Sequence, residues 1–550
     1  MSQTYTTTLA APVAFPSESR AVSRLSSLDW QPLLVATLAL LFGAVSTYLA
    51  ARGDLILLYN DSMSHLDVAR RVVDSRTPGL VQLGTVWLPV PHMLLLPLVW
   101  DHFLWRSGLA GSIVGVVCLM ITAVTLFQSI RMITSHQSVA WLGVAVLLTN
   151  PNVLYLQSTA LTEPVLLATM TASAYFLLRW NRTGSHISLT LAGCTAMLAV
   201  GSRYDGWFFA VVCAALVFIV TWLGTRKLAD AQGVSLAYAV LPVYAMVLWV
   251  VYNWVIFGDP LYFQRSEFSA AFQQQRFFLE GKLPTRGSLS ISTLTYAWAV
   301  LENVGVLVVA LGALGLLVFT LRTRFNRDSL TSYAFLSGLP FNIIALYLGQ
   351  SIIMVPTMDP PGYFNIRYGI VLLPGIALFV AYLANELARW VRPFAAGVMV
   401  VLVLAVQVSL WLPGWPRSVI TIADGLGGMS TKTNPVQTAH YLRDNYQGGG
   451  VLVDDTLVGL IFESGLDLKE FVGTGNGDLW RSALKDPANN VEWVAFRPNE
   501  MGDRVTAALE GEPALTENFT QVYAAEDYVV YERNSDIAAN ANGSGDSEVD

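Results

Sequence analysis

The sequence predicts a polytopic α-helical membrane protein with a small α/β domain after the last helix. Hydrophobic residues make up 54% of the 550 residues and charged residues only 13%, about half the charged fraction of a typical soluble protein. Apolar stretches of about 20 residues, long enough to span a bilayer, recur from residue 30 to residue 413. After residue 413, alternating and turn-rich sequence is typical of a water-exposed α/β unit. The net charge of -7 argues against a nucleic-acid-binding protein, which would carry a concentrated basic face.

The apolar stretches predict about eleven transmembrane helices, an odd number that places the two termini on opposite sides of the membrane. The expected helices are 31–51, 109–130, 138–157, 162–179, 187–202, 206–224, 236–257, 303–321, 332–353, 369–386 and 393–412. Basic residues follow alternate ends of these stretches, so the positive-inside rule places the N-terminus in the cytoplasm. The first apolar run lacks a small-residue cleavage site. We therefore expect an uncleaved, multi-pass protein of the plasma membrane.

This topology divides the chain into regions with different environments. The expected regions are a polar cytoplasmic N-terminus (1–29), a transmembrane domain (30–413), an extracytoplasmic α/β domain (414–534) and a disordered acidic tail (535–550). In the α/β domain we expect a helix at 434–446 and strands at 450–455, 493–497 and 523–533.

Two outer segments are longer than simple connectors. Segment 52–108 holds two amphipathic stretches, 62–74 and 92–105, which predict helices lying in the membrane interface. In segment 258–302, the stretch FQQQRFF at 272–278 predicts either a mobile loop that covers a substrate or an ordinary interfacial segment.

Ionisable residues beside membrane helices are costly and are therefore functional candidates. Asp61 and His65 lie four residues apart and would share one face of a helix, although Asp61 could merely cap the helix and His65 could merely pack. Glu163 begins the fourth predicted helix, where an acid also suits the helix start. Arg203 and Asp205 occupy a tight outer hairpin and could simply pair with each other.

Arg367 begins the tenth predicted helix on the outer side, against the positive-inside trend. Its fork of donors could hold a lipid phosphate, or it could form an interhelical salt bridge. Gln82 and Trp87 belong to a Gly/Trp/Pro segment that could line a sugar pocket or anchor at the interface. Further candidates share the outer side with these motifs: Tyr204, Arg265, Tyr363, Asn365 and Tyr368.

No metal or cofactor is predicted. The sequence contains neither HExxH nor CxxC. Asp61 and Glu163 could share a divalent cation such as Mg²⁺ or Mn²⁺ through oxygen ligands, but no fixed spacing indicates it. Nothing resembles a phosphate-binding P-loop, so ATP hydrolysis is not expected, and the glycine-rich GTGNG at 473–477 stands alone in the C-terminal region.

Over about residues 30–412 the chain resembles GT-C superfamily glycosyltransferases and is similar to the protein mannosyltransferases and the aminoarabinose transferases. The residues that carry the resemblance are Asp61 in the long first outer segment, Glu163, Arg203-Tyr204-Asp205 and Arg367-Tyr368. The resemblance implies transfer of a sugar, mannose or another hexose or pentose, from a polyprenyl-phosphate donor. The extracytoplasmic acceptor would be a glycan, a lipid or a protein. Asn60 and Ser62 flank Asp61, so the paired first-loop acids of some members are missing, which argues against a metal-dependent mechanism.

The resemblance also implies Asp61 as the catalytic carboxylate and inversion at the anomeric carbon. As a general base, Asp61 would take the proton of the acceptor hydroxyl. Arg367, with Arg203 or Arg265, would stabilise the leaving phosphate. Glu163 and Asp205 would orient Asp61, His65 or the sugar hydroxyls.

The sequence is also compatible with two other functional classes. A transporter or flippase of a lipid-linked or small polar substrate would also be polytopic, but transporters place ionisable residues near the bilayer midplane. A non-catalytic scaffold could use the C-terminal domain to bind a partner in the cell envelope.

Overall fold

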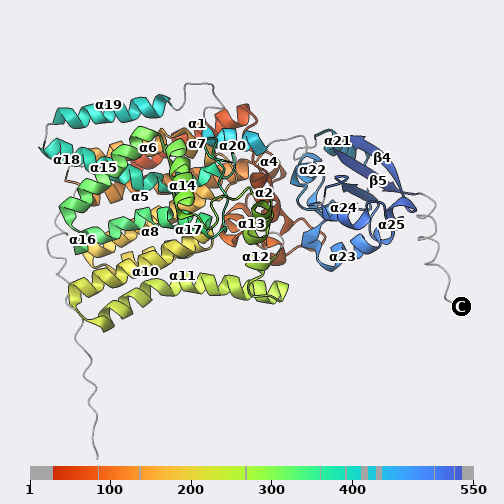
Figure 1. Cartoon of the computed structure of the whole chain (residues 1–550), viewed down its shortest axis with the longest axis horizontal. Helices are drawn as coiled ribbons and strands as arrows, with labels where there is room; N and C mark the ends of the chain where they lie inside the picture. Colours follow the sequence, from red (N-terminus) through yellow and green to blue (C-terminus); the bar gives the residue numbers. More distant parts are fainter. Residues whose placement is uncertain are drawn as a thin grey trace, which may run out of the picture.

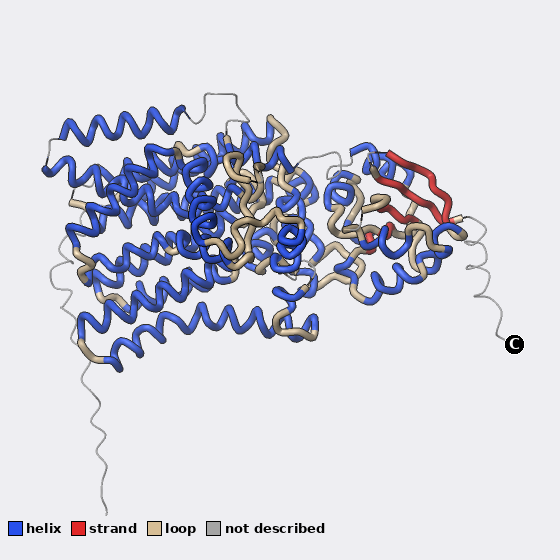
Figure 2. The backbone as a smooth tube through the Cα atoms, viewed as in Figure 1, coloured by secondary structure: helices blue, strands red, loops and turns tan. Residues whose placement is uncertain are grey.

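The computed structural model describes residues 29–84, 86–135, 138–266, 269–359, 361–390, 393–409, 419–428, 436–500, 502–525 and 527–534. The predicted N-terminal region and acidic tail therefore lie outside the described residues, except for residue 29. A bundle of long helices makes up most of the molecule, and a smaller unit with a β-sheet lies at one end of it (Figures 1 and 2).

Seven long helices form the body of the bundle, where Figure 1 shows several of them running side by side. They are α1 (Gln31–Arg52), α5 (Leu109–Ile133), α8 (Glu163–Thr183), α10 (Tyr204–Thr225), α11 (Leu228–Phe257), α15 (Val306–Thr323) and α18 (Leu373–Trp390). Shorter helices complete it: α6 (Val139–Leu148), α7 (Pro151–Leu156), α9 (His186–Val200), α14 (Leu289–Val304), α16 (Arg327–Leu330), η3 (Thr331–Leu336), α17 (Gly338–Tyr347), η4 (Ile366–Leu372), α19 (Pro393–Ser409) and α20 (Ile420–Gly428).

Every predicted transmembrane stretch contains helix, but the helices are not all single spans. Among the described residues, six helices are long and apolar enough to cross a membrane, and a pair bent by 45°, Arg327–Leu336 with Gly338–Tyr347, would make a seventh. The stretch 138–157 breaks at Asn150, whose side chain caps α7 directly before Pro151. Since α9 and α19 are also shorter than a full span, the number of eleven transmembrane helices stays a prediction.

The first outer segment contains short helices, as predicted, with different bounds. They are α2 (Asn60–Arg71), η2 (Leu80–Leu83), α3 (Pro89–Leu95) and α4 (His102–Arg106). The single helix predicted at 92–105 is therefore wrong: α3 ends at Leu95, and a new helix begins after Asp101, whose side chain accepts a hydrogen bond from the Leu104 amide.

The second long outer segment contains more regular structure than a loop. It holds α12 (Tyr262–Arg265) and α13 (Ala270–Leu279), and then α14, which occupies residues predicted as loop. Serine and threonine in LSISTLTYAWAVLENV lower the hydropathy of α14, so the apolar-stretch criterion missed all of this helix before residue 303.

The C-terminal unit is built on a five-stranded sheet with the order β2-β1-β3-β5-β4. The strands are β1 (Val451–Leu452), β2 (Phe471–Val472), β3 (Trp493–Phe496), β4 (Phe519–Ala525) and β5 (Tyr528–Arg533). Its helices are α21 (Val436–Asn445), α22 (Val458–Glu463), η5 (Leu468–Glu470), η6 (Thr474–Asn476), α23 (Asp478–Lys485), η7 (Pro487–Asn489), α24 (Arg504–Leu509) and α25 (Pro513–Thr516). Strands β1, β2 and β3 are parallel, whereas β5 pairs antiparallel with β3 and β4. The single strand predicted at 523–533 is wrong, because a turn divides it between β4 and β5.

Candidate functional site

Arg367 in η4 is the centre of a cluster of charged side chains. Its Nη2 donates to Oδ2 of Asp61 at 2.5 Å, and its Nε donates to Oε1 of Glu163 at 3.0 Å. The guanidinium is only 5% exposed. Three segments that are far apart in the sequence, α2, the start of α8 and η4, therefore meet at one arginine.

A second arginine extends this cluster. Arg203 Nη1 donates to the same Glu163 oxygen at 3.1 Å, and Arg203 Nε donates to Asp205 Oδ2 at 3.3 Å. The Tyr368 ring lies 4.4 Å from the Arg203 guanidinium and 5.3 Å from that of Arg367, where its face attracts both cations. Glu163, 1% exposed, is shared by both arginines, as a buried carboxylate requires.

Asp424 in α20 is a member of the cluster that sequence reasoning missed. Its Oδ2 lies 3.9 Å from Nη1 of Arg367 and accepts a hydrogen bond from the Tyr59 hydroxyl at 3.2 Å. Burial raises the pKa of Asp424 to about 6, although the Arg367 charge opposes this shift. The sequence signal for Asp424 was a single acid inside the apolar segment ITIADGLGG. It was overlooked because residues after 413 were assigned to the water-exposed domain.

Buried asparagines hold the segments of the cluster together. The side-chain amide of Asn303 donates to the backbone oxygen of Ile366, next to Arg367, at 2.7 Å. The backbone oxygen of Asn303 in turn accepts from the Asn152 side chain at 3.0 Å, and Asn152 Oδ1 accepts from the Thr421 amide at 3.1 Å. These hydrogen bonds connect η4 and α20 to the same point of the bundle.

Asp61 differs from the other acids of the cluster because it is accessible. Its side chain is 40% exposed, whereas those of Glu163, Asp205 and Asp424 are buried. Four carboxylates and two arginines give the cluster an excess of negative charge, and Asp61 is the acid that a ligand can reach from solvent.

His65 lies on α2 near the cluster but does not pair with its acids. Its Nδ1 shares a hydrogen bond of 2.9 Å with Nε2 of His92, and its ring centroid is 4.3 Å from that of Trp87. Burial and the positive charges of Arg367 and Arg203 lower the pKa of His65 to about 3. His65 is therefore a neutral imidazole at neutral pH.

The remaining predicted residues are distributed around the cluster or away from it. The Tyr204 hydroxyl donates to the Val86 backbone oxygen at 2.9 Å, which holds the segment that carries Trp87. The exposed Tyr363 lies beside Gly427 of α20, and the Asn365 amide donates to the Ile352 oxygen at 3.2 Å. Arg265, 65% exposed, pairs with Asp259 outside the cluster.

Gln82 contacts the C-terminal unit. Its side-chain amide donates to the backbone oxygen of Gly475 at 2.9 Å, in the GTGNG segment that stood alone in the sequence. Among the described residues, no three His, Cys, Asp or Glu side chains form a group that could hold a metal ion. The carboxylates of Asp61 and Glu163 are instead bridged by the Arg367 guanidinium.

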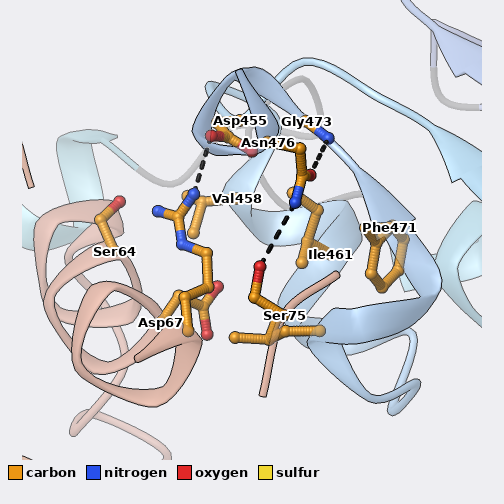
Figure 3. Close-up of a pocket in the computed structure, with 11 residues that line it drawn as sticks. Ser64, Asp67, Ser75, Asp455, Val458, Ile461, Phe471, Gly473 and Asn476 are labelled. Carbon is orange, nitrogen blue, oxygen red and sulfur yellow. Dashed lines mark hydrogen bonds and ion pairs between the residues drawn. The ribbon is translucent and has the colours of Figure 1, made fainter. Parts of the chain in front are cut away.

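A small cavity lies at the junction between α2 and the C-terminal unit, and Figure 3 shows its labelled side chains. Ser64, Asp67 and Arg71 line it from α2, and Asp455 and Asn476 line it from the C-terminal unit. Asp455 Oδ2 accepts from Arg71 Nη1 at 2.7 Å. Asp67, also buried, accepts a hydrogen bond from the Trp105 indole at 3.1 Å. Burial raises the pKa of Asp67 to about 7, against the opposing charge of Arg71.

The raised pKa of Asp67 predicts a pH-dependent stability. Between about pH 4 and about pH 7, the folded protein keeps a proton on Asp67 that the unfolded chain releases. The free energy of unfolding therefore falls as the pH rises through this range, by at most about 4 kcal/mol. We expect Asp67→Asn, which retains an acceptor for Trp105, to melt at a higher temperature than the parent protein at pH 8 but not at pH 4. Asp444→Asn, at an exposed carboxylate, is the control. An equal difference at both pH values would contradict the assignment.

Comparison with known proteins identifies the fold. No protein-family model matches the chain, and no curated protein matches it significantly. Among solved structures, ArnT from Cupriavidus metallidurans bound to undecaprenyl phosphate superimposes with a TM-score of 0.54 and 14% identity, over 93% of this chain and 99% of that chain. The apo oligosaccharyltransferase of Archaeoglobus fulgidus gives a TM-score of 0.51 and 12% identity, over 92% of this chain and 75% of that chain.

A further structure is similar to the chain. It is the archaeal oligosaccharyltransferase AglB from Archaeoglobus fulgidus in complex with an inhibitory peptide and a dolichol-phosphate, with a TM-score of 0.50 and 12% identity, over 92% of this chain and 74% of that chain. Identities this low establish the architecture alone. Together with the apolar helices, these similarities confirm the resemblance: the chain is a multi-pass membrane protein with the fold of the GT-C glycosyltransferases.

Proposed function

We propose that the protein is a membrane glycosyltransferase that moves a sugar from a polyprenyl-phosphate donor to an extracytoplasmic acceptor. The observation that carries this proposal is the contact between one accessible carboxylate, Asp61, and one buried arginine, Arg367. Transfer from a sugar phosphate requires a group that accepts a proton and a cation that holds the phosphate. These two groups meet here at the surface of the charged cluster.

The phosphate of the donor would compete with Asp61 for the Arg367 guanidinium. Nη2 of Arg367 is the atom that donates to Asp61, and a phosphate oxygen would replace that acceptor through a charge-assisted hydrogen bond. Asp61 would then lose its pairing, and the negative charge of the phosphate would make it a stronger base. Arg367 would stay in place, because Glu163 holds its Nε.

The chemical step is a single displacement. The acceptor oxygen attacks the anomeric carbon, the bond from that carbon to the phosphate oxygen breaks, and the bonding electrons leave with the polyprenyl phosphate. Asp61 takes the proton of the acceptor hydroxyl, and Arg367 stabilises the charge that develops on the leaving phosphate. Arg203, which pairs with Glu163 and Asp205, keeps Glu163 in position. Attack from the opposite side inverts the anomeric carbon.

Aromatic side chains near the cluster would contact the sugar. Trp87 and Tyr363 are exposed, and Trp87 lies against His65 on the same helix as Asp61. Two of the similar solved structures support a polyprenyl-phosphate donor, since ArnT was solved with undecaprenyl phosphate and AglB with a dolichol-phosphate.

The distribution of charge supports an extracytoplasmic site. At the opposite ends of the long helices, Arg131 pairs with Asp29, and Arg322 and Arg389 lie beside Glu386. The positive-inside rule makes those ends cytoplasmic. The charged cluster and the C-terminal unit, at the other end of the bundle (Figure 1), would then face the outside.

The test is incubation of the purified protein with polyprenyl-phosphate mannose, arabinose, glucose and galactose, with cell-envelope extract as the source of acceptor. We expect release of free polyprenyl phosphate from at least one donor, and release that is slower by about 10²- to 10⁴-fold with Asp61→Asn. A donor that crosses the membrane of proteoliposomes without release of polyprenyl phosphate would indicate a flippase instead, and no release from any donor would contradict the proposal.

A further inference from the structure

The helix that carries Asp61 is connected at its other end to the C-terminal unit. Asp61 lies in the first turn of α2, and Arg70 and Arg71 lie in its last turn. At a rise of 1.5 Å per residue, about 15 Å separates the two ends. No side chain caps the start of α2, so the position of Asp61 depends on its own contact with Arg367 and on contacts elsewhere along the helix.

The strongest polar contact at the far end joins Arg71 to Asp455. Nη1 of Arg71 donates to Oδ2 of Asp455 at 2.7 Å, and both side chains are largely buried. The same carboxylate oxygen accepts from the Thr474 hydroxyl at 2.5 Å and from the Gly475 amide at 3.2 Å. Figure 3 shows Asp455 directed across the junction toward α2. The glycine-rich segment thus orients the acid that receives Arg71.

The glycines of this segment allow the close approach. A Cβ atom on Gly473 would lie 2.1 Å from Asp455 Oδ1, and one on Gly475 would lie 2.8 Å from Gln82 Oε1. Any larger residue at 473 would displace the carboxylate. The GTGNG sequence therefore fits contact with a neighbouring side chain.

Further contacts make the junction a continuous interface. Asp74, three residues after the end of α2, accepts from Arg70 Nε at 3.0 Å and from the Lys469 amide at 3.2 Å. Arg106 of α4 donates to backbone oxygens of Phe462 and Leu466. Apolar side chains from both sides form one buried cluster: Met63, Leu66, Ala69 and Trp105 with Val458, Ile461, Phe462 and Phe471.

We infer that the C-terminal unit positions Asp61 for transfer, with Arg71 and Asp455 as the positioning residues. This inference rests on the proposed function. A tilt of α2 by about 4° moves a group 15 Å from the pivot by about 1 Å, and a misplacement of this size costs about a hundredfold in rate. Arg71 pairs with Asp455 and not with the charged cluster. The arginines that would bind the donor, Arg367 and Arg203, are held by Glu163, so they keep their place when the Arg71–Asp455 contact is lost.

The experiment compares Arg71→Met, Asp455→Asn and the double variant in the full-length protein, with Arg443→Met as control. Arg443 pairs with Asp444 on the exposed face of α21 in the same unit. We expect kcat to fall about 10- to 100-fold in both single variants, while the KM for the donor changes by less than about twofold. The double variant should lose no more than either single variant, since both remove one contact.

A second measurement does not depend on activity. Amide hydrogen exchange of residues 60–64 should be faster in Arg71→Met than in the parent protein and unchanged in Arg443→Met. Unaltered kcat and exchange, or equal losses of donor affinity and kcat, would overturn the inference. If the parent protein releases no polyprenyl phosphate from any donor, the proposed function fails, and the exchange comparison still decides whether the C-terminal unit controls α2.

Discussion

Replacing Asp61 with asparagine is expected to reduce sugar transfer by about 10²- to 10⁴-fold, the usual contribution of a general base. Asparagine has nearly the same shape, and its oxygen still accepts a hydrogen bond from Arg367 Nη2, so the cluster should stay assembled. The amide cannot take a proton from the acceptor hydroxyl. The measurement is the initial rate of polyprenyl phosphate release, together with the melting temperature of the same sample.

Asp259→Asn is the matched control for this variant. Asp259 pairs with the exposed Arg265 in the second long outer segment, and the same chemical change there should leave the rate unchanged. Donor binding should survive in Asp61→Asn, because Arg367 remains. Full transfer activity in folded Asp61→Asn would show that another group accepts the proton.

Replacing Arg367 with methionine is expected to abolish donor binding and to destabilise the protein by about 3–5 kcal/mol, the cost of removing one partner from a buried ion pair. Glu163 and Asp424 would stay buried next to a side chain without charge, and Asp61 would lose the guanidinium that donates to it. The measurements are thermal unfolding in detergent and binding of polyprenyl phosphate.

Arg367→Lys separates the two effects of this change. Lysine keeps the positive charge but has no planar fork that reaches Asp61 and Glu163 together. We therefore expect a smaller loss of stability than in Arg367→Met, with donor affinity still reduced. Arg389→Met, at the opposite end of the bundle, is the control. Wild-type affinity for polyprenyl phosphate in Arg367→Met would remove Arg367 from the donor site.

The helical architecture could be predicted because membrane insertion depends on the hydropathy of contiguous segments. The same criterion missed nearly all of α14, because its serine and threonine residues lower the hydropathy of the segment. It also joined α6 and α7 into one span, since the break at Asn150 is stabilised by hydrogen bonds to distant Asn303. In the C-terminal unit, the sequence predicted a single strand at 523–533, whereas β4 and β5 form a hairpin there. The two strands have similar composition, so the sequence did not show where one ends and the next begins.

The candidate site could be predicted as a set of residues but not as an arrangement. Asp61, Glu163, Arg203 and Arg367 stood out because charges are rare in this chain and these lie on its outer side. Asp424 was missed. Gln82, which belongs to a segment that could line a sugar pocket, instead contacts the C-terminal unit. Local sequence gives no information on which residues pair when the partners are far apart along the chain.

The sequence alone determined that the protein has a polytopic helical architecture and that a few outer charges mark its candidate site. Both properties follow from hydropathy and from the cost of charge near a bilayer, which act on each segment separately. The contacts of Arg367 with Asp61, Glu163 and Asp424, and the connection from Asp61 through α2 to the C-terminal unit, depend on the folded arrangement of the whole chain. Asp61 and Arg367 are 306 positions apart, and only the packing of the whole bundle brings such residues into contact.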